Sequence, residues 1–337
     1  MKTLRTAAAL LGIALLAGPG LASAGAAPVP ANFGPIAFAA TSNDRWWVLG
    51  SAPCKSPPCT AILASQNAGR SFSALPAPKT GEVHGLRFAD PKNGFAFGPE
   101  LWSTHNGAGS WKQVNVGGSV VNLVASGGRA YALVRTASGT GRLFRSPVGR
   151  DDWHPIGNFA GYPFAGLWAQ GATVIVETQD RKHASVLISK DSGDHFTVVG
   201  HPPPSVACQL QGPLPVVWAY CATGNESGVW RSLDGGRDFR GVGGDATRSG
   251  VPPEPNSAAF VAPTPTAAVY GYEQLWRTAD AGAHWSRIPG TRGAIWWMYL
   301  GFTDATHGVA LGQFQGGYRL YRTIDGGQSY RRVLFRA

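Results

Sequence analysis

The eight residues SKDSGDHF, from Ser189 to Phe196, recur in altered form along the chain. SLDGGRDF begins at Ser232, TADAGAHW at Thr278 and TIDGGQSY at Thr323. Near-copies at a regular spacing are the sequence signature of repeat folds such as solenoids and propellers. The fold must therefore be inferred from this repeat before any of its residues is assigned a chemical role.

The repeat occurs seven times. Each copy has Ser or Thr first and an aromatic residue eighth, and successive copies are about 39 to 46 residues apart. The copies begin at Ser65, Thr104, Ser146, Ser189, Ser232, Thr278 and Thr323. The third position is an amide or a carboxylate in six copies: Asn67, Asn106, Asp191, Asp234, Asp280 and Asp325. The remaining copy, SPVGRDDW, has Val148 there.

The residue types of the repeat are those of a tight turn. A short amide or carboxylate that follows a hydroxyl can accept hydrogen bonds from the backbone N–H groups of a loop. Glycine near the middle permits a positive φ, and the closing aromatic residue can begin a strand and pack beneath it. We therefore interpret the six amide or carboxylate side chains as parts of a turn rather than as catalytic acids or metal ligands.

Four strand-like segments surround each copy of the turn. Residues 298–335 divide into an apolar run, a turn, GVALG, a Gly-rich turn, YRLYRT, the repeated turn and YRRVLF. Four short strands in a unit of about 43 residues are typical of a propeller blade. The sequence therefore predicts an all-β, seven-bladed β-propeller with four antiparallel strands per blade. The repeated turn should join the third and fourth strands.

The composition agrees with this fold. Charged residues make up 14% of the chain, whereas Gly (46) and Pro (25) are abundant, which favours short strands and turns over helices. Hydrophobic residues make up 44%, enough to bury a large core. We expect a single propeller domain over residues 25–337, in which residues 25–34 add an edge strand that helps to close the ring.

The repeated turn resembles the Asp-box, or bacterial neuraminidase repeat, which is shared by sialidases, xyloglucanases, sortilin-type receptors and photosystem II assembly factors. Two longer segments, FADPKNGFAFG (88–98) and FTDATHGVALG (302–312), are most similar to the photosystem II stability/assembly factor group and its bacterial relatives. The resemblance covers almost all of the chain after the N-terminal segment and implies a propeller. It implies no single function, because the same blades occur in hydrolases and in proteins that only bind.

The first 24 residues have the features of a secretory signal peptide. MKTLR is basic, TAAALLGIALLAGPGL is apolar, and the small residues Ala22, Ser23 and Ala24 follow. No later segment is apolar for long enough to span a bilayer. We expect cleavage after Ala24 and a secreted or periplasmic protein whose mature chain has no transmembrane segment.

Four cysteines remain after this segment, and export permits disulfides. Four cysteines allow three pairings, of which we predict the local one, Cys54–Cys59 and Cys208–Cys221. A zinc site built from all four thiolates is the alternative, but neither their spacing nor export favours it. We expect no metal and no cofactor.

The net charge of +10 favours an acidic partner. An exported chain without a basic cluster is not expected to bind nucleic acid, which leaves an exported or membrane protein, or an anionic glycan. Non-repeated loops usually carry specificity, and here they occupy 178–184, 222–228, 243–256, 270–274 and the connection 289–297. The predicted binding residues are Arg181, Lys182, Arg248, Tyr272, Arg292, Trp296 and Trp297. The alternative is that these are ordinary solvated loop residues.

The innermost strands should line a central channel. His84 and Arg87 lie at the start of the second blade, and Trp168 lies at the equivalent place in the fourth. Such residues either fill space between wedge-shaped blades or form a recognition surface at the channel mouth. Four arginines instead precede copies of the repeated turn and are expected to be parts of the scaffold: Arg145, Arg231, Arg277 and Arg322.

Sialidase activity is not expected. The sialidase resemblance would imply an arginine triad, a Tyr–Glu pair and an acidic proton carrier, with the first arginine in a Phe-Arg-Ile-Pro motif ahead of the first repeat. This chain has no such motif there, and six blades are usual in that family.

Other glycoside hydrolases need two carboxylates roughly 5–10 Å apart. Glu226 and Glu273, with Tyr272 beside Glu273, are the candidates for such a pair. We therefore expect a non-enzymatic binding or assembly protein, with a glycoside hydrolase as the alternative.

Overall fold

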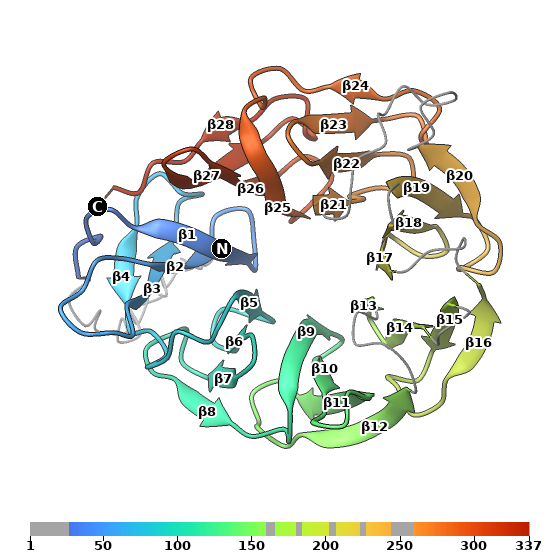
Figure 1. Cartoon of the computed structure of the whole chain (residues 1–337), viewed down its shortest axis with the longest axis horizontal. Helices are drawn as coiled ribbons and strands as arrows, with labels where there is room; N and C mark the ends of the chain where they lie inside the picture. The colour runs from blue at the N-terminus through green and yellow to red at the C-terminus, as the bar shows by residue number, and fades with distance from the viewer. Residues whose placement is uncertain are drawn as a thin grey trace, which may run out of the picture.

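The computed structural model describes residues 27–159, 166–179, 184–201, 207–222, 227–243 and 259–336. The described residues form strands β1 to β28 and no helix. The strands make seven four-stranded sheets, which are arranged as blades around a ring (Figure 1). This confirms the prediction of an all-β, seven-bladed propeller. Residues 1–24, the predicted signal peptide, lie outside the described residues.

Each blade is contiguous in the sequence and is ordered from the centre of the ring outward. The innermost strands are β1 (Gly34–Ala40), β5 (Gly85–Phe88), β9 (Ser119–Ser126), β13 (Leu167–Gln170), β17 (Ala207–Gln211), β21 (Ala259–Val261) and β25 (Ala294–Phe302). The second strands are β2 (Trp46–Ser51), β6 (Gly94–Phe97), β10 (Arg129–Arg135), β14 (Thr173–Gln179), β18 (Val217–Ala222), β22 (Ala268–Gly271) and β26 (Gly308–Phe314).

The outer half of each blade is shorter. The third strands are β3 (Thr60–Ser65), β7 (Leu101–Thr104), β11 (Gly141–Pro147), β15 (Ala184–Ser189), β19 (Ser227–Ser232), β23 (Leu275–Thr278) and β27 (Gly317–Thr323). The outermost strands are β4 (Ser73–Leu75), β8 (Lys112–Val114), β12 (His154–Phe159), β16 (Thr197–Gly200), β20 (Arg240–Gly243), β24 (Ser286–Arg287) and β28 (Arg331–Arg332). Short edge strands offer little unpaired backbone to another chain.

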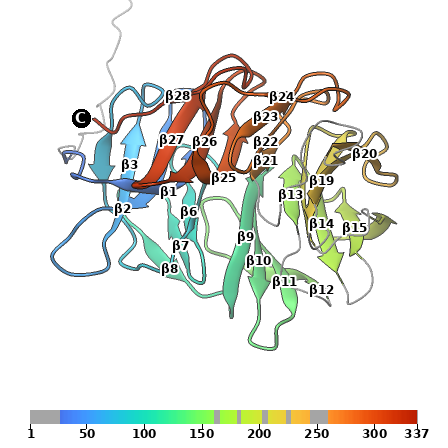
Figure 2. The same cartoon turned by 45° about the horizontal axis from the view of Figure 1, so that its top comes forward.

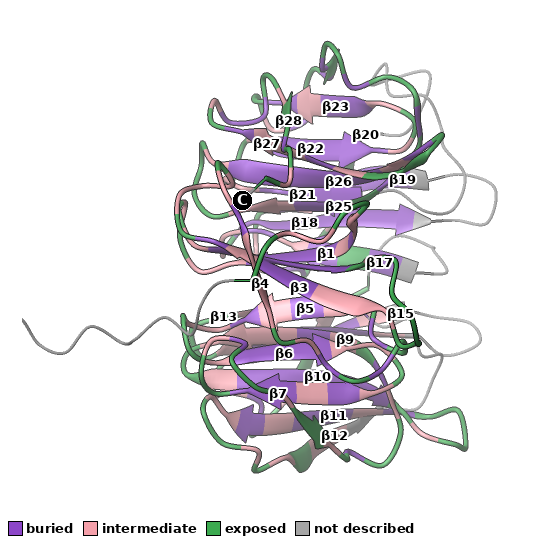
Figure 3. Cartoon of the chain, turned by 90° about the vertical axis from the view of Figure 1, so that its left-hand side faces the viewer, coloured by how far each residue is buried: buried purple, intermediate pink, exposed green. Residues whose placement is uncertain are grey.

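The antiparallel order divides the connections between two faces of the ring. Turns that join first to second strands and third to fourth strands lie on one face, which we call the turn face. Loops that join second to third strands and connections between blades lie on the other, which we call the loop face. Figure 3 shows mostly buried strands, with exposed residues gathered in the connections on both sides. The repeated turn joins the third and fourth strands, as its position in the sequence predicts.

A hydroxyl and a third-position carboxylate or amide oxygen hold six of the seven repeated turns together. The Ser189 hydroxyl donates to Oδ1 of Asp191 over 2.6 Å and accepts the Gly193 N–H over 2.7 Å. Oδ1 of Asp191 also accepts the His195 N–H over 3.0 Å. Equivalent bonds recur in the turns that start at Ser65, Thr104, Ser232, Thr278 and Thr323.

Two copies depart from the pattern and keep the turn by other means. In the second copy Ala108 replaces the expected glycine at the fifth position and adopts a positive φ of 74°. In the third copy, which lacks the carboxylate, the Ser146 hydroxyl donates to the Arg150 carbonyl over 2.7 Å. The same hydroxyl accepts the Asp152 N–H over 3.1 Å. The turn therefore depends on the hydroxyl more than on the acid.

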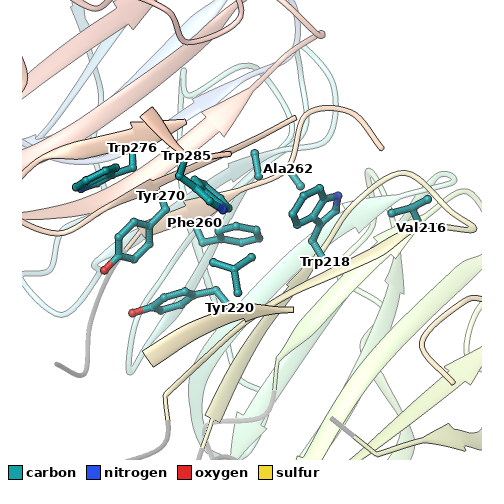
Figure 4. Packing of buried hydrophobic residues seen from close by; sticks show 10 residues of the cluster. Val216, Trp218, Tyr220, Phe260, Ala262, Tyr270, Trp276 and Trp285 are labelled. Atoms are coloured by element: carbon teal, nitrogen blue, oxygen red, sulfur yellow. The ribbon is translucent and has the colours of Figure 1, made fainter. Parts of the chain in front are cut away.

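The core consists of clusters between neighbouring blades. Between the fifth and sixth blades, Trp218 and Tyr220 of β18 pack with Phe260 of β21 and Tyr270 of β22, and Trp285 closes the cluster (Figure 4). Fully burying a large apolar side chain stabilises a fold by roughly 1.5–3 kcal/mol. Most of the stability therefore comes from contacts between blades, because a single four-stranded sheet cannot bury both of its faces.

The arginines that precede the repeated turns also join neighbouring blades. Arg145 donates to the Ser192 carbonyl of the next blade over 2.8 Å, and Arg277 donates to the Gly326 carbonyl over 2.8 Å. Arg231 also donates to the next blade, to the Pro265 carbonyl over 3.1 Å. This confirms the prediction that these arginines are parts of the scaffold.

Both chain ends pack on the first blade, where the ring closes. The Ala74 N–H of β4 donates to the Ala27 carbonyl, so the N-terminal residues add one bridge rather than a full edge strand. The Phe72 N–H donates to the Arg336 carbonyl over 2.7 Å, and Figures 1 and 2 place the C-terminal end beside this blade. The Phe335 ring lies 5.0 Å from the Phe33 ring. Among residues 27–40 and 320–336, which the structure describes, the ends are thus joined by packing and single hydrogen bonds, without exchange of a strand.

The two predicted disulfides are present. Cys54 and Cys59 close a short loop between β2 and β3, and Cys208 joins its register partner Cys221 across β17 and β18. Two disulfides indicate an oxidising compartment outside the cytoplasm. Within the described residues, no helix could cross a membrane.

Candidate binding surface

A channel of about 940 Å³ runs through the centre of the ring. Its described lining comes from the innermost strands of the second to seventh blades, with contributions from the loops and strands beside them. His84, Arg87 and Trp168, which the sequence places at the channel, all line it. Arg135, at the end of β10, joins them from the loop face.

The channel has a cationic wall. Arg87 and Arg135 supply its positive charge, His84 lies in the same lining, and no Asp or Glu is among the described residues that line it. Nε of Arg87 donates to the Leu123 carbonyl over 3.4 Å, which fixes the side chain against β9. Arginine presents several N–H donors in a planar fork that matches a carboxylate. The channel is therefore suited to an anionic group.

Exposed apolar side chains occur on two of the innermost strands, β9 and β25. Val121 of β9 is 36% exposed and Met298 of β25 is 41% exposed, and both line the channel. Ile295 and Trp296, at the loop-face end of β25, are 42% and 40% exposed. These four residues, which we call the apolar patch, lie on innermost strands, where most large side chains are buried. Exposed apolar patches with a polar surround mark interaction surfaces.

The two faces differ in their acidic residues. Every described aspartate lies in a connection of the turn face: Asp44, Asp90, Asp151, Asp152, Asp191, Asp194, Asp234, Asp238, Asp280, Asp304 and Asp325. The described acidic residues of the loop face are three glutamates, Glu82, Glu100 and Glu273. The described part of the loop face therefore carries fewer carboxylates that could repel an acidic partner than the turn face does.

Hydrogen bonds lower the pKa of several turn-face aspartates. The Ser189 hydroxyl, the His195 N–H and the His195 ring hold the pKa of Asp191 well below its usual value. The backbone and ring of His284, with the Thr278 hydroxyl, lower the pKa of Asp280 to about 2. These carboxylates serve the turns, so their perturbed pKa values do not mark an active site.

The structure brings some of the predicted binding residues together. Arg292 is exposed in the connection that leads into β25, close in sequence to Trp296. The Tyr272 carbonyl accepts the Trp297 N–H over 2.8 Å, so the β22–β23 loop lies beside the start of β25. Tyr272 itself is half-buried against the core cluster of the sixth blade, and Glu273 beside it is exposed.

One predicted binding residue is in the core instead. Trp297 is 1% exposed and packs against the Phe314 and Tyr321 rings at 5.6 and 5.3 Å. Its side chain points away from solvent, because successive residues of a strand face opposite sides. The prediction that Trp297 contacts a partner is therefore wrong.

Four other candidates lie outside the described residues: Arg181, Lys182, Glu226 and Arg248. Arg181, Lys182 and Arg248 remain predicted binding residues of the loop face. The proposed carboxylate pair of Glu226 and Glu273 also remains a prediction.

Glu177 is a buried acid that sequence reasoning missed. It lies on β14, is 1% exposed, and its Oε2 accepts the Cys208 N–H from the next blade over 2.9 Å. Oε1 has no hydrogen-bond partner among the described residues. Burial raises the pKa of Glu177 to about 8 although the Cys208 N–H lowers it. The signal was one acid directly after the apolar residues Val174 to Val176 of its strand.

Glu177 supports the channel wall from behind. Gly166 and Cys208, which line the channel, both contact it: the Glu177 N–H donates to the Gly166 carbonyl over 2.8 Å. The described residues bring no three His, Cys, Asp or Glu side chains together as a metal site. Glu177 is therefore best described as a positioning residue between the fourth and fifth blades.

Comparison with known proteins identifies the fold and no family. No protein-family model matches the chain, and no curated protein matches it. Among solved structures, YCF48 from Cyanidioschyzon merolae is similar with a TM-score of 0.61 and 13% identity, covering 89% of this chain and 98% of that one. The structure of YCF48 bound to D1 peptide is similar with a TM-score of 0.59 and 14% identity, covering 89% of this chain and 96% of that one.

A third similar structure is the β-propeller domain of the Trilobed protease from Pyrococcus furiosus, described as having an open velcro topology. Its TM-score is 0.60 at 10% identity, covering 90% of this chain and 98% of that one. At such identities the likeness shows the propeller fold alone, and function must be argued from the surface of this chain.

Proposed function

We propose that this chain is an exported, non-enzymatic binding protein that holds an acidic segment of another protein at its loop face and in the adjoining channel. The observation that carries the proposal is the channel itself, in which Arg87, Arg135 and His84 line a cavity without a described carboxylate. Recessed cations focus their field on a ligand because low-dielectric walls surround them.

The apolar patch favours a protein segment over an anionic glycan. A glycan would satisfy Arg87 and Arg135 but would leave Val121 and Met298 facing polar groups. A protein segment can place carboxylates on the arginines and apolar side chains on the patch, the mixture found at protein interfaces. The structure of YCF48 bound to D1 peptide gives one precedent for a peptide on a propeller of this kind.

Export is part of the proposal. The N-terminal 24 residues have the pattern of a cleavable signal peptide, and the two disulfides agree with an oxidising compartment. The partner would then be another exported protein or the exposed part of a membrane protein. A glycoside hydrolase has less support, since the described channel lining lacks the carboxylate pair that such enzymes use.

The proposal is tested by binding to an array of random synthetic dodecapeptides, with sulfated oligosaccharides printed beside them. We expect peptides rich in Asp and Glu to be retained, and their retention to fall as the NaCl concentration rises. The double variant Arg87→Gln/Arg135→Gln should weaken the best peptides about tenfold or more, because each lost charged hydrogen bond contributes roughly 1.5–3 kcal/mol.

A matched control is Arg70→Gln/Arg150→Gln, which removes two cations from repeated turns on the opposite face. It should leave peptide binding unchanged. The proposal would be refuted if sulfated oligosaccharides were retained in preference to peptides. It would also be refuted if both double variants lost peptide affinity equally.

A further inference from the structure

A second, smaller cavity lies at the turn-face end of the channel, where the seventh blade meets the first and second. We call it the seam pocket. It is formed by the ends of three innermost strands, with Phe38 to Ala40 from β1, Arg87 and Phe88 from β5, and Tyr299, Gly301 and Phe302 from β25. Its volume is about 100 Å³.

The walls of the seam pocket are mainly apolar. Phe38, Trp46, Phe88 and Val309 are buried residues of the surrounding cores, and Ala40 lies half-buried at the end of β1. Apolar walls of this kind favour an apolar group over a polar one.

The polar groups at the rim are engaged with one another. The Asn43 side-chain N–H donates to Oδ2 of Asp304 over 2.7 Å, and the His307 ring nitrogen Nδ1 lies 3.0 Å from the same oxygen. Arg322 donates to the Ala68 carbonyl over 2.8 Å. An occupant would therefore gain little from these polar groups and would depend on the apolar walls.

The seam pocket and the channel are neighbours. Four residues line both cavities: Arg87, Tyr299, Gly301 and Phe302. A segment held in the channel could therefore place one side chain in the seam pocket while its own acidic groups remain near Arg87. Arg87 would then bind an acidic group of the segment directly beside the apolar pocket, because Arg87 lines both the channel and the seam pocket.

The volume decides what kind of group fits. Sites for small-molecule ligands usually measure about 300–1,000 Å³, well above this cavity. An apolar cavity of about 150 Å³ holds one benzene ring. A pocket of about 100 Å³ is thus suited to one aliphatic side chain, and not to a free cofactor or metabolite.

We infer that the seam pocket is a selectivity pocket for one aliphatic side chain, such as Leu, Ile or Met, of the acidic segment that occupies the channel. The inference rests on the proposed function. It adds a defined sequence preference, which is an aliphatic residue close to an acidic one.

The test uses the same dodecapeptide array with a variant that fills the pocket. Ala40→Phe places a ring where Ala40 now lines the cavity, and Ala279→Phe makes the same change at an exposed position on the turn face of the sixth blade. Wild type and Ala279→Phe should both select an aliphatic residue at one position near the acidic residues. Ala40→Phe should lose that preference, and the best peptides should bind about tenfold more weakly, while salt-sensitive retention of acidic peptides persists.

The two proposals fail in different ways. If no acidic peptide is retained by wild type, the proposed function is wrong and the pocket has no segment to select. If acidic peptides are retained without an aliphatic preference, or if the preference survives in Ala40→Phe, the selectivity pocket is refuted while the binding function stands. Ala40→Val serves as a smaller filling change if Ala40→Phe does not fold, and it should weaken the preference for Ile and Met in the same direction.

Discussion

Arg322 in the last blade donates a hydrogen bond from Nη1 to the carbonyl oxygen of Ala68 in the first blade over 2.8 Å. Arg145 and Arg277 make the equivalent contact with the repeated turn of the blade that follows each of them. The ring is therefore closed by the same arginine contact that joins blades within it. The described parts of the two ends exchange no strand, so this contact and the packing around it hold the ring closed.

Removing the closing contact should destabilise the ring. Arg322→Met leaves the Ala68 carbonyl without its donor, and we expect the free energy of unfolding to fall by about 1–3 kcal/mol. Arg277→Met is the matched control inside the ring, since it removes the same contact from Gly326. Denaturant unfolding should show that Arg322→Met lowers the free energy of unfolding at least as much as Arg277→Met does. An unchanged midpoint for Arg322→Met would show that closure does not depend on the contact.

In the six copies that have an amide or a carboxylate at the third position, this side chain acts as a hydrogen-bond acceptor, which needs no charge. Oδ1 of Asp325 accepts from the Thr323 hydroxyl and from the Gln328 and Ser329 N–H groups, over 2.7 to 3.0 Å. Asp325→Ala should lower the melting temperature by several degrees, because two backbone donors lose their acceptor. Asp325→Asn should lower it little, as an amide oxygen serves in the first two copies. Equal losses in the two variants would contradict this.

The same aspartate should make stability fall in acid. Burial tends to raise the pKa of Asp325, but the hydrogen bonds from Ser329 and Thr323 outweigh it and hold the pKa below its usual value. A carboxylate with a lowered pKa stabilises the fold above its unfolded pKa, and the effect disappears as pH falls through the folded value. Asp325→Asn should therefore reduce the loss of melting temperature below about pH 4. An identical acid profile in wild type and variant would contradict the assignment.

Glu177 should have the opposite pH dependence. Its pKa is raised to about 8 by burial, so between about pH 4.5 and 8 the unfolded chain loses a proton that the folded chain keeps. Stability should fall as pH rises across this window, by at most about 1.4 kcal/mol per pH unit. Glu177→Gln should flatten that part of the profile, measured by denaturant unfolding at several pH values. A slope that persists in Glu177→Gln would assign it to another group.

The two disulfides should differ in reactivity. Cys54 is exposed in its loop, whereas Cys208 and Cys221 are buried in the core. Because a thiolate reductant must reach the sulfur, mild reduction without denaturant should open Cys54–Cys59 first. Alkylation and peptide mass spectrometry would show this order. Reduction of both bonds at one rate would mean that the fifth blade opens readily.

The sequence allowed the fold to be predicted because the repeated turn combines three constraints at one spacing. A hydroxyl, an acceptor and an aromatic residue recur once per blade, and the period of about 43 residues matches four short strands. The recurrence of arginine before the turn also indicated a scaffold role, which the contacts of Arg145 and Arg277 confirm. These features are local, so they can be recognised without knowledge of the packed structure.

The binding surface was less predictable because it depends on register and on neighbouring blades. Trp296 and Trp297 are adjacent, yet one is exposed and the other is in the core. Strand alternation requires such a difference, but irregular pairing on both sides of this pair hides which residue faces solvent. Glu177 was missed for a similar reason, since its partner, the Cys208 N–H, belongs to another blade.

The central claim is that an acidic protein segment binds the loop face and channel. It is tested most directly by the dissociation constant of the best acidic dodecapeptide for Arg181→Glu/Arg248→Glu/Arg292→Glu. The matched control, Arg70→Glu/Arg150→Glu/Arg237→Glu, changes the net charge equally on the turn face. We predict that the first variant keeps its melting temperature and loses affinity about a hundredfold, while the control stays within about twofold of wild type. Retained affinity in the first variant, or equal losses in both, would contradict the claim.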